Sequence, residues 1–177
     1  IQVAGGIVAG LGILFLGMGM MGDALVPMQE SKAFVQLMTT FSNPFLGILA
    51  GAAFTAVIQS SSASVGILQA LMVSGLIGID SAVFVLFGQN IGTCVTALIS
   101  SAGAGKNAKR ASVIHLLFNV IGAVVFGIIM FVLFRFNAAW GAAAINSVEI
   151  SVFHTIFNVL NTLMPVSYTH LTLPTKL

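Results

Sequence analysis

Long apolar stretches without charged side chains restrict what this chain can fold into more than any other feature. Residues 111–134 contain no Asp, Glu, Lys or Arg, and residues 81–101 form a second run of this kind. A helix of about 20 apolar residues crosses the hydrocarbon core of a bilayer. Only 6% of the residues are charged, too few to cover a water-soluble surface, on which charged residues are far more frequent. The strands of a membrane barrel would alternate apolar and polar residues, and these runs do not. The chain is therefore predicted to be an all-α polytopic membrane protein.

The two ends of the chain contribute further helices and a polar tail. Residues 3–21 are apolar and rich in glycine, which favours a membrane helix that its neighbours approach closely. Residues 28–42 mix polar and apolar side chains at helical spacing, as is typical of an amphipathic helix at the membrane surface. A last apolar helix is expected over residues 147–164, ended by Pro165. Residues 1–165 are predicted to form one transmembrane repeat. We expect this repeat to be a fragment, because no Met precedes it, and residues 166–177 to be a non-native or disordered tail.

A polar cluster of sequence Gln-Ser-Ser-Ser-Ala-Ser occupies residues 59–64, between two apolar runs. Hydroxyl and amide groups are costly inside a membrane unless they bind something. A helix over Pro44–Ile58 would be about 22 Å long, which is less than the roughly 30 Å of a hydrocarbon core. The apolar run over residues 65–79 is equally short. These lengths favour a re-entrant helical hairpin with the polar cluster at its tip. The alternative is one straight helix over residues 44–79, which would be longer than a span requires.

A second polar interruption, Gly-Gln-Asn-Ile-Gly-Thr, occupies residues 88–93, and its glycines predict a broken helix. A helix break leaves free N–H groups at the start of one half-helix, which favour an anion, and free C=O groups at the end of the other, which favour a cation. Groups able to bind a phosphate-like anion or a cation are the side chains of Gln59, Ser60, Ser61, Ser62 and Ser64. Neutral oxygens suited to a hard cation come from Gln89, Asn90, Thr93 and Thr96. Neither cluster contains a charged side chain, so the sequence predicts reversible binding of an anion together with a cation.

A His and an Asn recur four residues apart in two of the expected helices, as His115 with Asn119 and as His154 with Asn158. Residues four apart share a helix face, so both pairs are expected to face a common interior and to bond between helices. A catalytic serine is the other interpretation of Ser62 with His115. The sequence has no nucleophile-elbow motif, and no carboxylate has an obvious place behind the His. The protein is therefore predicted not to be an enzyme.

Three of the basic residues, Lys106, Lys109 and Arg110, fall in the expected loop over residues 102–110. Basic loops of membrane proteins face the cytoplasm, so this loop is predicted to be cytoplasmic. Three charges are too few for a nucleic-acid surface, and no nucleic-acid partner is expected.

Three motifs follow one another along the chain: Gln59-Ser-Ser-Ser62, Gly88-Gln-Asn-Ile-Gly-Thr93 and His115-x-x-Phe-Asn119. In order and spacing they resemble the sodium/phosphate cotransporter family, which includes the type II animal cotransporters and bacterial members. The resemblance covers residues 3–165 and is greatest to the second repeat of the bacterial members. Cys94 departs from the family pattern, in which Thr is usual. The resemblance implies a fold of two inverted repeats, each with one such hairpin, of which this chain supplies one half.

The resemblance also implies which residues bind. The residues implied to bind phosphate are Gln59, Ser60, Ser61 and Ser62. The residues predicted to bind sodium, the coupling ion, are Gln59, Gln89, Asn90, Thr93 and Thr96; of these, the resemblance implies that Gln59 lines the site, that Thr93 and Thr96 coordinate the ion, and that Asn90 packs or bonds beside them. Supporting roles are expected for Ser64, His115 and Asn119. No cofactor and no metal ion other than sodium are expected. The facing half of the site would come from a missing N-terminal repeat of the same protein or from a second copy.

The expected function is therefore sodium-coupled symport of inorganic phosphate across a membrane, the bacterial inner membrane being the expected location. The expected partners are phosphate, sodium and the lipid bilayer. The alternative function is that of a phosphate-sensing or scaffolding membrane module without transport, because a chain with one repeat does not obviously enclose a transport path.

Overall fold

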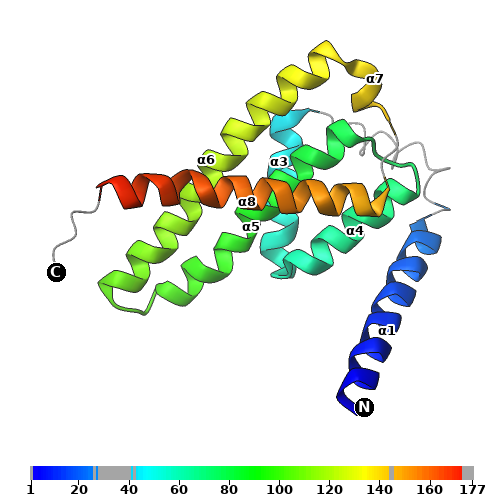
Figure 1. Ribbon diagram of the computed structural model, residues 1–177, viewed down its shortest axis with the longest axis horizontal. Coiled ribbons are helices and arrows are strands. Elements are labelled where there is room, and N and C mark those ends of the chain that lie inside the picture. Colours follow the sequence, from blue (N-terminus) through cyan, green and yellow to red (C-terminus); the bar gives the residue numbers. More distant parts are fainter. Residues whose placement is uncertain (1, 26, 28–40, 42, 144–145, 173–177) are drawn as a thin grey trace.

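The computed structural model describes residues 2–25, 27, 41, 43–143 and 146–172 of the chain, and its regular structure there is helical (Figure 1). This agrees with the predicted all-α class. The helix expected over residues 28–42 lies outside the described residues. The helices are α1 (Gln2–Leu25), α3 (Pro44–Ile58), α4 (Ser61–Val73), α5 (Ile79–Ser101), α6 (Lys106–Phe136), α7 (Ala138–Gly141) and α8 (Ser147–Thr172).

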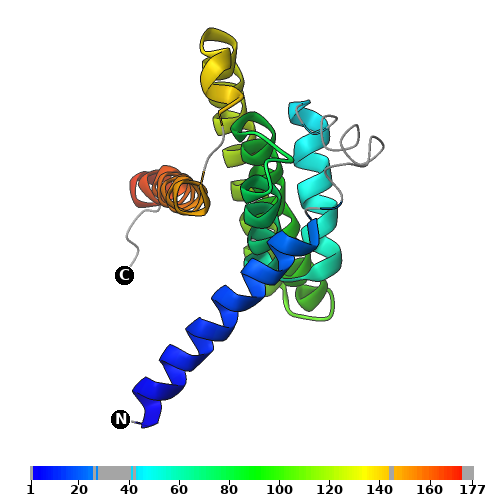
Figure 2. The same cartoon turned by 90° about the vertical axis from the view of Figure 1, so that its right-hand side faces the viewer.

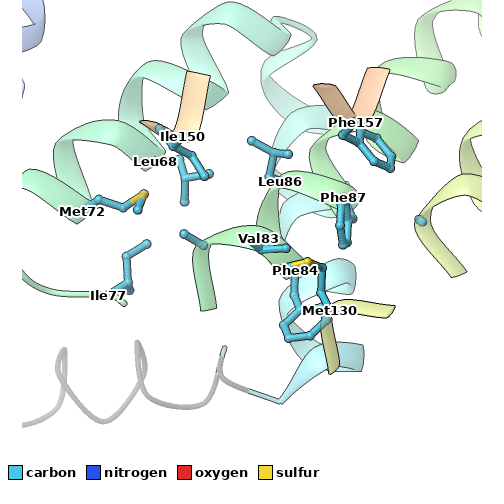
Figure 3. Packing of buried hydrophobic residues seen from close by; sticks show 12 residues of the cluster. Leu68, Met72, Ile77, Val83, Phe84, Leu86, Phe87, Met130, Ile150 and Phe157 are labelled. Atoms are coloured by element: carbon cyan, nitrogen blue, oxygen red, sulfur yellow. The ribbon is translucent and has the colours of Figure 1, made fainter. Parts of the chain in front are cut away.

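Helix α5 lies at the centre of the molecule, with α3 on one side and α8 on the other (Figure 2). Its side chains are apolar on several faces, and Phe84 and Phe87 are fully buried. The ring centroid of Phe87 lies 4.7 Å from that of Phe157 on α8, which in turn lies 5.2 Å from that of Phe126 on α6. Figure 3 shows this core, which also receives Leu68 from α4. Aromatic packing thus joins α8 and α6 to the central helix.

Among the described residues, two helices are long and apolar enough to cross a membrane, namely α5 with 23 residues and α6 with 31 residues. Helices α3 and α4 are apolar but have only 15 and 13 residues. At 1.5 Å per residue, each would cover about 20 Å, less than a full crossing. These lengths fit the predicted re-entrant hairpin. The hairpin's position in a bilayer and the inverted-repeat arrangement stay predictions.

The break between α3 and α4 falls at Gln59 and Ser60, where the polar cluster begins. Figure 1 shows α3 and α4 meeting at this break and both running from it toward the same side of the molecule, as the two arms of a hairpin do. The alternative of one straight helix over residues 44–79 is therefore wrong. The second arm begins at Ser61 instead of residue 65, and ends at Val73 instead of residue 79. Three of the four serines consequently belong to α4, because Ser60 precedes its first turn as the N-cap residue.

The second predicted break, over residues 88–93, is wrong, because α5 is a continuous helix through them. Its glycines instead allow α3 to pack at backbone distance. A Cβ atom added at Gly88 would collide with the carbonyl oxygen of Ile48, and one at Gly51 would collide with that of Val85. Small residues on facing helices permit this close approach in membrane proteins. The cost of glycine to helix propensity is thus offset by packing between α3 and α5.

Two helix ends also differ from the predicted ones. Helix α6 begins at Lys106, so Lys109 and Arg110 lie in its first two turns and not in a loop. Helix α8 continues through Pro165 to Thr172, so the predicted end at this proline is wrong. A proline removes one backbone hydrogen bond, which helices of membrane proteins tolerate. That residues 166–177 form a non-native tail stays a prediction.

Candidate functional site

The backbone conformation of two residues forms the break between α3 and α4. Gln59 adopts the left-handed conformation (φ 55°, ψ 26°) that usually ends a helix at glycine. Its N–H donates to the carbonyl oxygen of Thr55 at 2.7 Å. Ser60 is extended, and its Oγ accepts a hydrogen bond from the N–H of Ala63 at 3.3 Å. Gln59 thus carries a side-chain amide at a left-handed position that is usually occupied by glycine.

The first turn of α4 presents hydroxyl groups together with free backbone donors. Ser61 and Ser62 are exposed, and the Oγ of Ser62 lies 3.4 Å from that of Ser60. The first N–H groups of a helix have no acceptor within that helix, and its dipole places partial positive charge there. The structure therefore brings together three of the four predicted phosphate ligands. The fourth, Gln59, adjoins them with an exposed side chain.

A cavity of about 890 Å³ lies beside these serines. Its walls come from α1, α4 and α8 and are mostly apolar. The polar residues in them are Ser61, Ser62 and Gln69 of α4 and His154 of α8. A volume of this size is typical of small-molecule sites, which combine apolar walls with a few polar groups. The cavity thus offers an anion-sized ligand access to the first turn of α4.

Three of the predicted sodium ligands, Gln89, Thr93 and Thr96, lie on one face of α5 because they are four and three residues apart. Gln89 is buried, and its Nε2 donates to the carbonyl oxygen of Ser64 at 2.9 Å. This bond links α5 to the first turns of α4. Thr93 donates its hydroxyl hydrogen to the carbonyl oxygen of Asn90 at 2.6 Å, which leaves its lone pairs available. Thr96 is exposed.

The fourth α5 residue, Asn90, faces α8. Its Nδ2 donates to the carbonyl oxygen of Leu86 at 3.0 Å, and its Oδ1 lies 3.5 Å from Nε2 of His154. His154 therefore contacts Asn90 and also lines the cavity beside Ser61 and Ser62. His154 shares the cavity wall with these serines, whereas His115, which the catalytic interpretation had paired with Ser62, is not among the residues that line the cavity.

The two His and Asn pairs make the same bond within their own helices. Asn119 donates to the carbonyl oxygen of His115 at 2.9 Å, and Asn158 donates to that of His154 at 2.8 Å. Asn119 is buried, whereas His115 stacks against Phe118. The predicted sharing of a face within each pair is confirmed. These bonds give Asn119 a structural role, and its supporting function in a site stays a prediction.

Two polar residues of this region were not predicted from the sequence. Thr55 is fully buried on α3, one turn before Gln59. Gln69 of α4 donates from its Nε2 to Oγ of Ser151 on α8 at 2.6 Å. Thr55 is the single polar side chain of α3, and Gln69 is the single polar side chain in residues 65–73 of α4, so this contrast with apolar neighbours could have identified both. Within the described part of the chain, no three His, Cys, Asp or Glu side chains are grouped so that they could hold a metal ion.

The model of the Na+/Pi-cotransporter family matches residues 13–161, which is most of the chain. The chain belongs to this family. Membership confirms the resemblance drawn from the three motifs. It also agrees with a membrane location and with transport in place of catalysis, because Na+/Pi cotransporters are membrane transporters. The α3–α4 break, the cavity serines and the polar face of α5 all lie within the matched region.

Three relatives illustrate the similarity within the cotransporter family. The uncharacterized protein YqeW of Bacillus subtilis is 32% identical over 92% of this chain and 52% of its own length. A Salmonella typhimurium protein named "Putative inorganic phosphate export protein YjbB" is 26% identical over 92% of this chain and 30% of its own. The rat sodium-dependent phosphate transport protein 2A is 37% identical over 48% of this chain and 14% of its own. The chain thus spans about half the length, or less, of these relatives. No solved structure matches it significantly.

Proposed function

We propose that the protein containing this chain carries out sodium-coupled transport of inorganic phosphate. The observation that carries the proposal is the first turn of α4, where Ser61 and Ser62 face a cavity at the positive end of a helix. Membership in the Na+/Pi-cotransporter family and the names of two relatives support phosphate as the substrate. The chain would supply one half of the substrate site.

Phosphate would bind to the helix N-terminus and its hydroxyl groups. Free N–H groups and the dipole at the start of a helix favour an anion. The hydroxyls of Ser60, Ser61 and Ser62 and the amide of Gln59 would donate to its oxygens. Helices α3 and α4 contain no charged side chain. A phosphate dianion would therefore need positive charge from another source, and a co-bound cation is that source.

Sodium would supply this charge from the adjacent face of α5. Gln89, Asn90, Thr93 and Thr96 carry neutral oxygens, which hard cations accept as ligands, and Gln59 would contribute from the break. The hydrogen bond from Nε2 of Gln89 to the carbonyl oxygen of Ser64 holds this face of α5 against α4, within one turn of Ser61 and Ser62, and so supports the proposal. A cation and an anion that offset each other's charge would bind together and leave together, which is what symport requires. Ser64, His115 and Asn119 would support these groups.

The facing half of the site would come from an N-terminal repeat of the same protein or from a second copy. Helices α3 and α4 would enter a bilayer as a re-entrant hairpin, and the two halves would form inverted repeats that rock against each other. The expected location is the bacterial inner membrane. Among the described residues, the walls of the cavity beside α4 come from α1, α4 and α8. A second candidate function, phosphate sensing without transport, would need only such a half-site.

Uptake of labelled phosphate into vesicles tests the proposal. Vesicles containing the whole gene product should accumulate phosphate when sodium chloride is outside, and should not when choline chloride replaces it. Sulfate added in excess should compete poorly if phosphate is the substrate. Equal uptake in both salts would contradict sodium coupling. Binding of phosphate without uptake in either salt would favour the sensing function.

The basic start of α6 predicts the orientation of the chain. Lys106, Lys109 and Arg110 are exposed at the first two turns of this helix, so this end should be cytoplasmic. A cysteine replacing the exposed Asn107 should react with an impermeant maleimide only after the cells are opened. The native Cys94 is buried and provides the unlabelled control. Labelling of intact cells at residue 107 would reverse the proposed orientation.

A further inference from the structure

One face of α6 begins with cationic side chains and continues with apolar ones. Lys106, Lys109 and Arg110 are exposed in the first two turns of this helix. The apolar residues that follow them at helical spacing are exposed as well, and they are Val113, Ile114, Leu117, Ile121, Val124 and Ile128. Residues three and four apart share a helix face, so the cations and the apolar side chains form one continuous strip. We call this strip the α6 outer face.

The α6 outer face points away from the core of the molecule. Helix α6 buries the opposite face, on which Asn119, Ala123 and Met130 lie. The six apolar side chains of the outer face are 47% to 64% exposed. At 1.5 Å per residue, the apolar part from Val113 to Ile128 is about 22 Å long, more than the roughly 15 Å that one leaflet contributes to a hydrocarbon core. An acyl chain of one leaflet would therefore find apolar contact along its whole length.

Buried hydroxyl groups fix the backbone that carries the three cations. The Oγ atoms of Ser101 on α5 and Ser112 on α6 lie 2.8 Å apart in a buried hydrogen bond. The Oγ of Ser112 also lies 2.9 Å from the carbonyl oxygen of Lys109, to which it can donate. These contacts tie the first turns of α6 to the end of α5. A fixed backbone lowers the entropy lost when an anion binds to the cations.

The charges at this end of α6 favour an anionic partner. Asp23 belongs to α1, which Figure 1 shows on the far side of the molecule from the α5–α6 turn. The carboxylates of Asp80 and Glu149 lie beside α7, at the other end of α6. A Cβ atom at Gly141 would stand 3.5 Å from that of Asp80, and Glu149 lines a pocket together with Trp140. Among the described residues, the cations at the start of α6 therefore have no carboxylate beside them, and the helix dipole adds partial positive charge.

We propose that the α6 outer face binds an anionic glycerophospholipid. The lipid phosphate contacts Lys106, Lys109 and Arg110, whose side chains donate charge-assisted hydrogen bonds to its oxygens. The acyl chains lie along the apolar part of the face. A headgroup part followed by a chain part is the order that a lipid has, whereas a second copy or another protein segment would need only the apolar part. This inference goes beyond the proposed transport and does not depend on it.

Thermal unfolding of the whole gene product in detergent micelles with added lipid tests the site. Dioleoylphosphatidylglycerol should raise the melting temperature above that in an equal amount of dioleoylphosphatidylcholine, because a ligand of the folded state stabilises it. Potassium chloride at about 1 M should remove most of this difference, since it screens charges beyond about 3 Å. Glycerophosphoglycerol, which is the same headgroup without acyl chains, should give no rise.

Two matched arginine variants of α6 locate the headgroup. Arg110→Gln should need about fivefold more phosphatidylglycerol for half of the rise, since one cation beside an anionic lipid contributes about 1 kcal/mol. Arg135→Gln is the control, because Arg135 is also exposed but lies in the last turn of α6, where the helix dipole is negative. This control should keep the wild-type lipid dependence. In phosphatidylcholine both variants should melt at the wild-type temperature, because both side chains are exposed.

Three results would overturn the lipid site. Equal melting temperatures in the two lipids would show that another segment or a second copy covers the α6 outer face in the whole protein. An equal loss in Arg110→Gln and Arg135→Gln would show that the lipid responds to net charge and not to this end of α6. A full rise with glycerophosphoglycerol would make the ligand a soluble anion. Absence of phosphate uptake would contradict the proposed transport and leave the lipid site standing.

Discussion

Gly88→Ala is expected to destabilise this protein more than any other single-methyl addition to α5. The new Cβ would collide with the carbonyl oxygen of Ile48, and this atom belongs to the backbone of α3. A flexible side chain could move aside, but a helix backbone must shift as a whole. Overpacking of this kind costs about 1–3 kcal/mol, against which alanine regains about 1 kcal/mol of helix propensity. The variant should therefore melt several degrees lower in detergent.

A matched glycine distinguishes packing from propensity. Gly127 lies inside α6, and a Cβ there would meet only Cδ1 of Ile48 at 3.9 Å, an ordinary contact. Gly127→Ala should therefore melt at or above the wild-type temperature. Gly88→Ala should also weaken phosphate uptake, because displacing α5 moves the neighbouring Gln89 away from Ser64. A Gly88→Ala protein as stable as Gly127→Ala would show that α3 and α5 are not packed at backbone distance.

The sequence predicted the first helix break, but the glycines of α5 led it to miss the continuity of that helix. At residues 59–60 a left-handed Gln59 and the N-cap Ser60 end one helix and begin the next, and a run of polar residues marks such a site. At residues 88–93 a similar polar run lies within a helix. Whether a glycine there weakens the helix or admits a neighbour depends on α3, which is distant in sequence. Local patterns contain no information on that contact.

The candidate site, like the helix breaks, was predicted from the sequence only in part. The serines and the polar face of α5 stand out because they contrast with an apolar background, and the structure places Gln89 against Ser64. Thr55 was missed because a single buried threonine in a helix usually bonds to its own backbone. Only the three-dimensional structure shows that its hydroxyl has no partner among the described residues. The proximity of His154 to Ser62 likewise depends on how α8 crosses α4 and was not visible in the sequence.

The double substitution Ser61→Ala with Ser62→Ala should abolish phosphate uptake at low phosphate concentration. Each hydroxyl would donate a charge-assisted hydrogen bond to phosphate, and such bonds contribute about 1.5–3 kcal/mol each. Since about 1.4 kcal/mol corresponds to a factor of ten, losing both should raise the half-saturating phosphate concentration at least about a hundredfold. The maximal rate, approached at very high phosphate, should fall less.

The fold should survive this double substitution, which makes the result interpretable. Ser60 keeps its capping bond to Ala63, and alanine is a better helix former than serine in the first turn of α4. The melting temperature in choline chloride should therefore equal or exceed that of the wild type. Ser74→Ala, at the other end of the same helix, removes a hydroxyl that donates to the carbonyl oxygen of Ala70 and should leave phosphate affinity unchanged. The phosphate affinity of the double variant then reports on the two hydroxyls alone, because the helix is not weakened. If the double variant transports phosphate with wild-type affinity, the first turn of α4 is not the phosphate site.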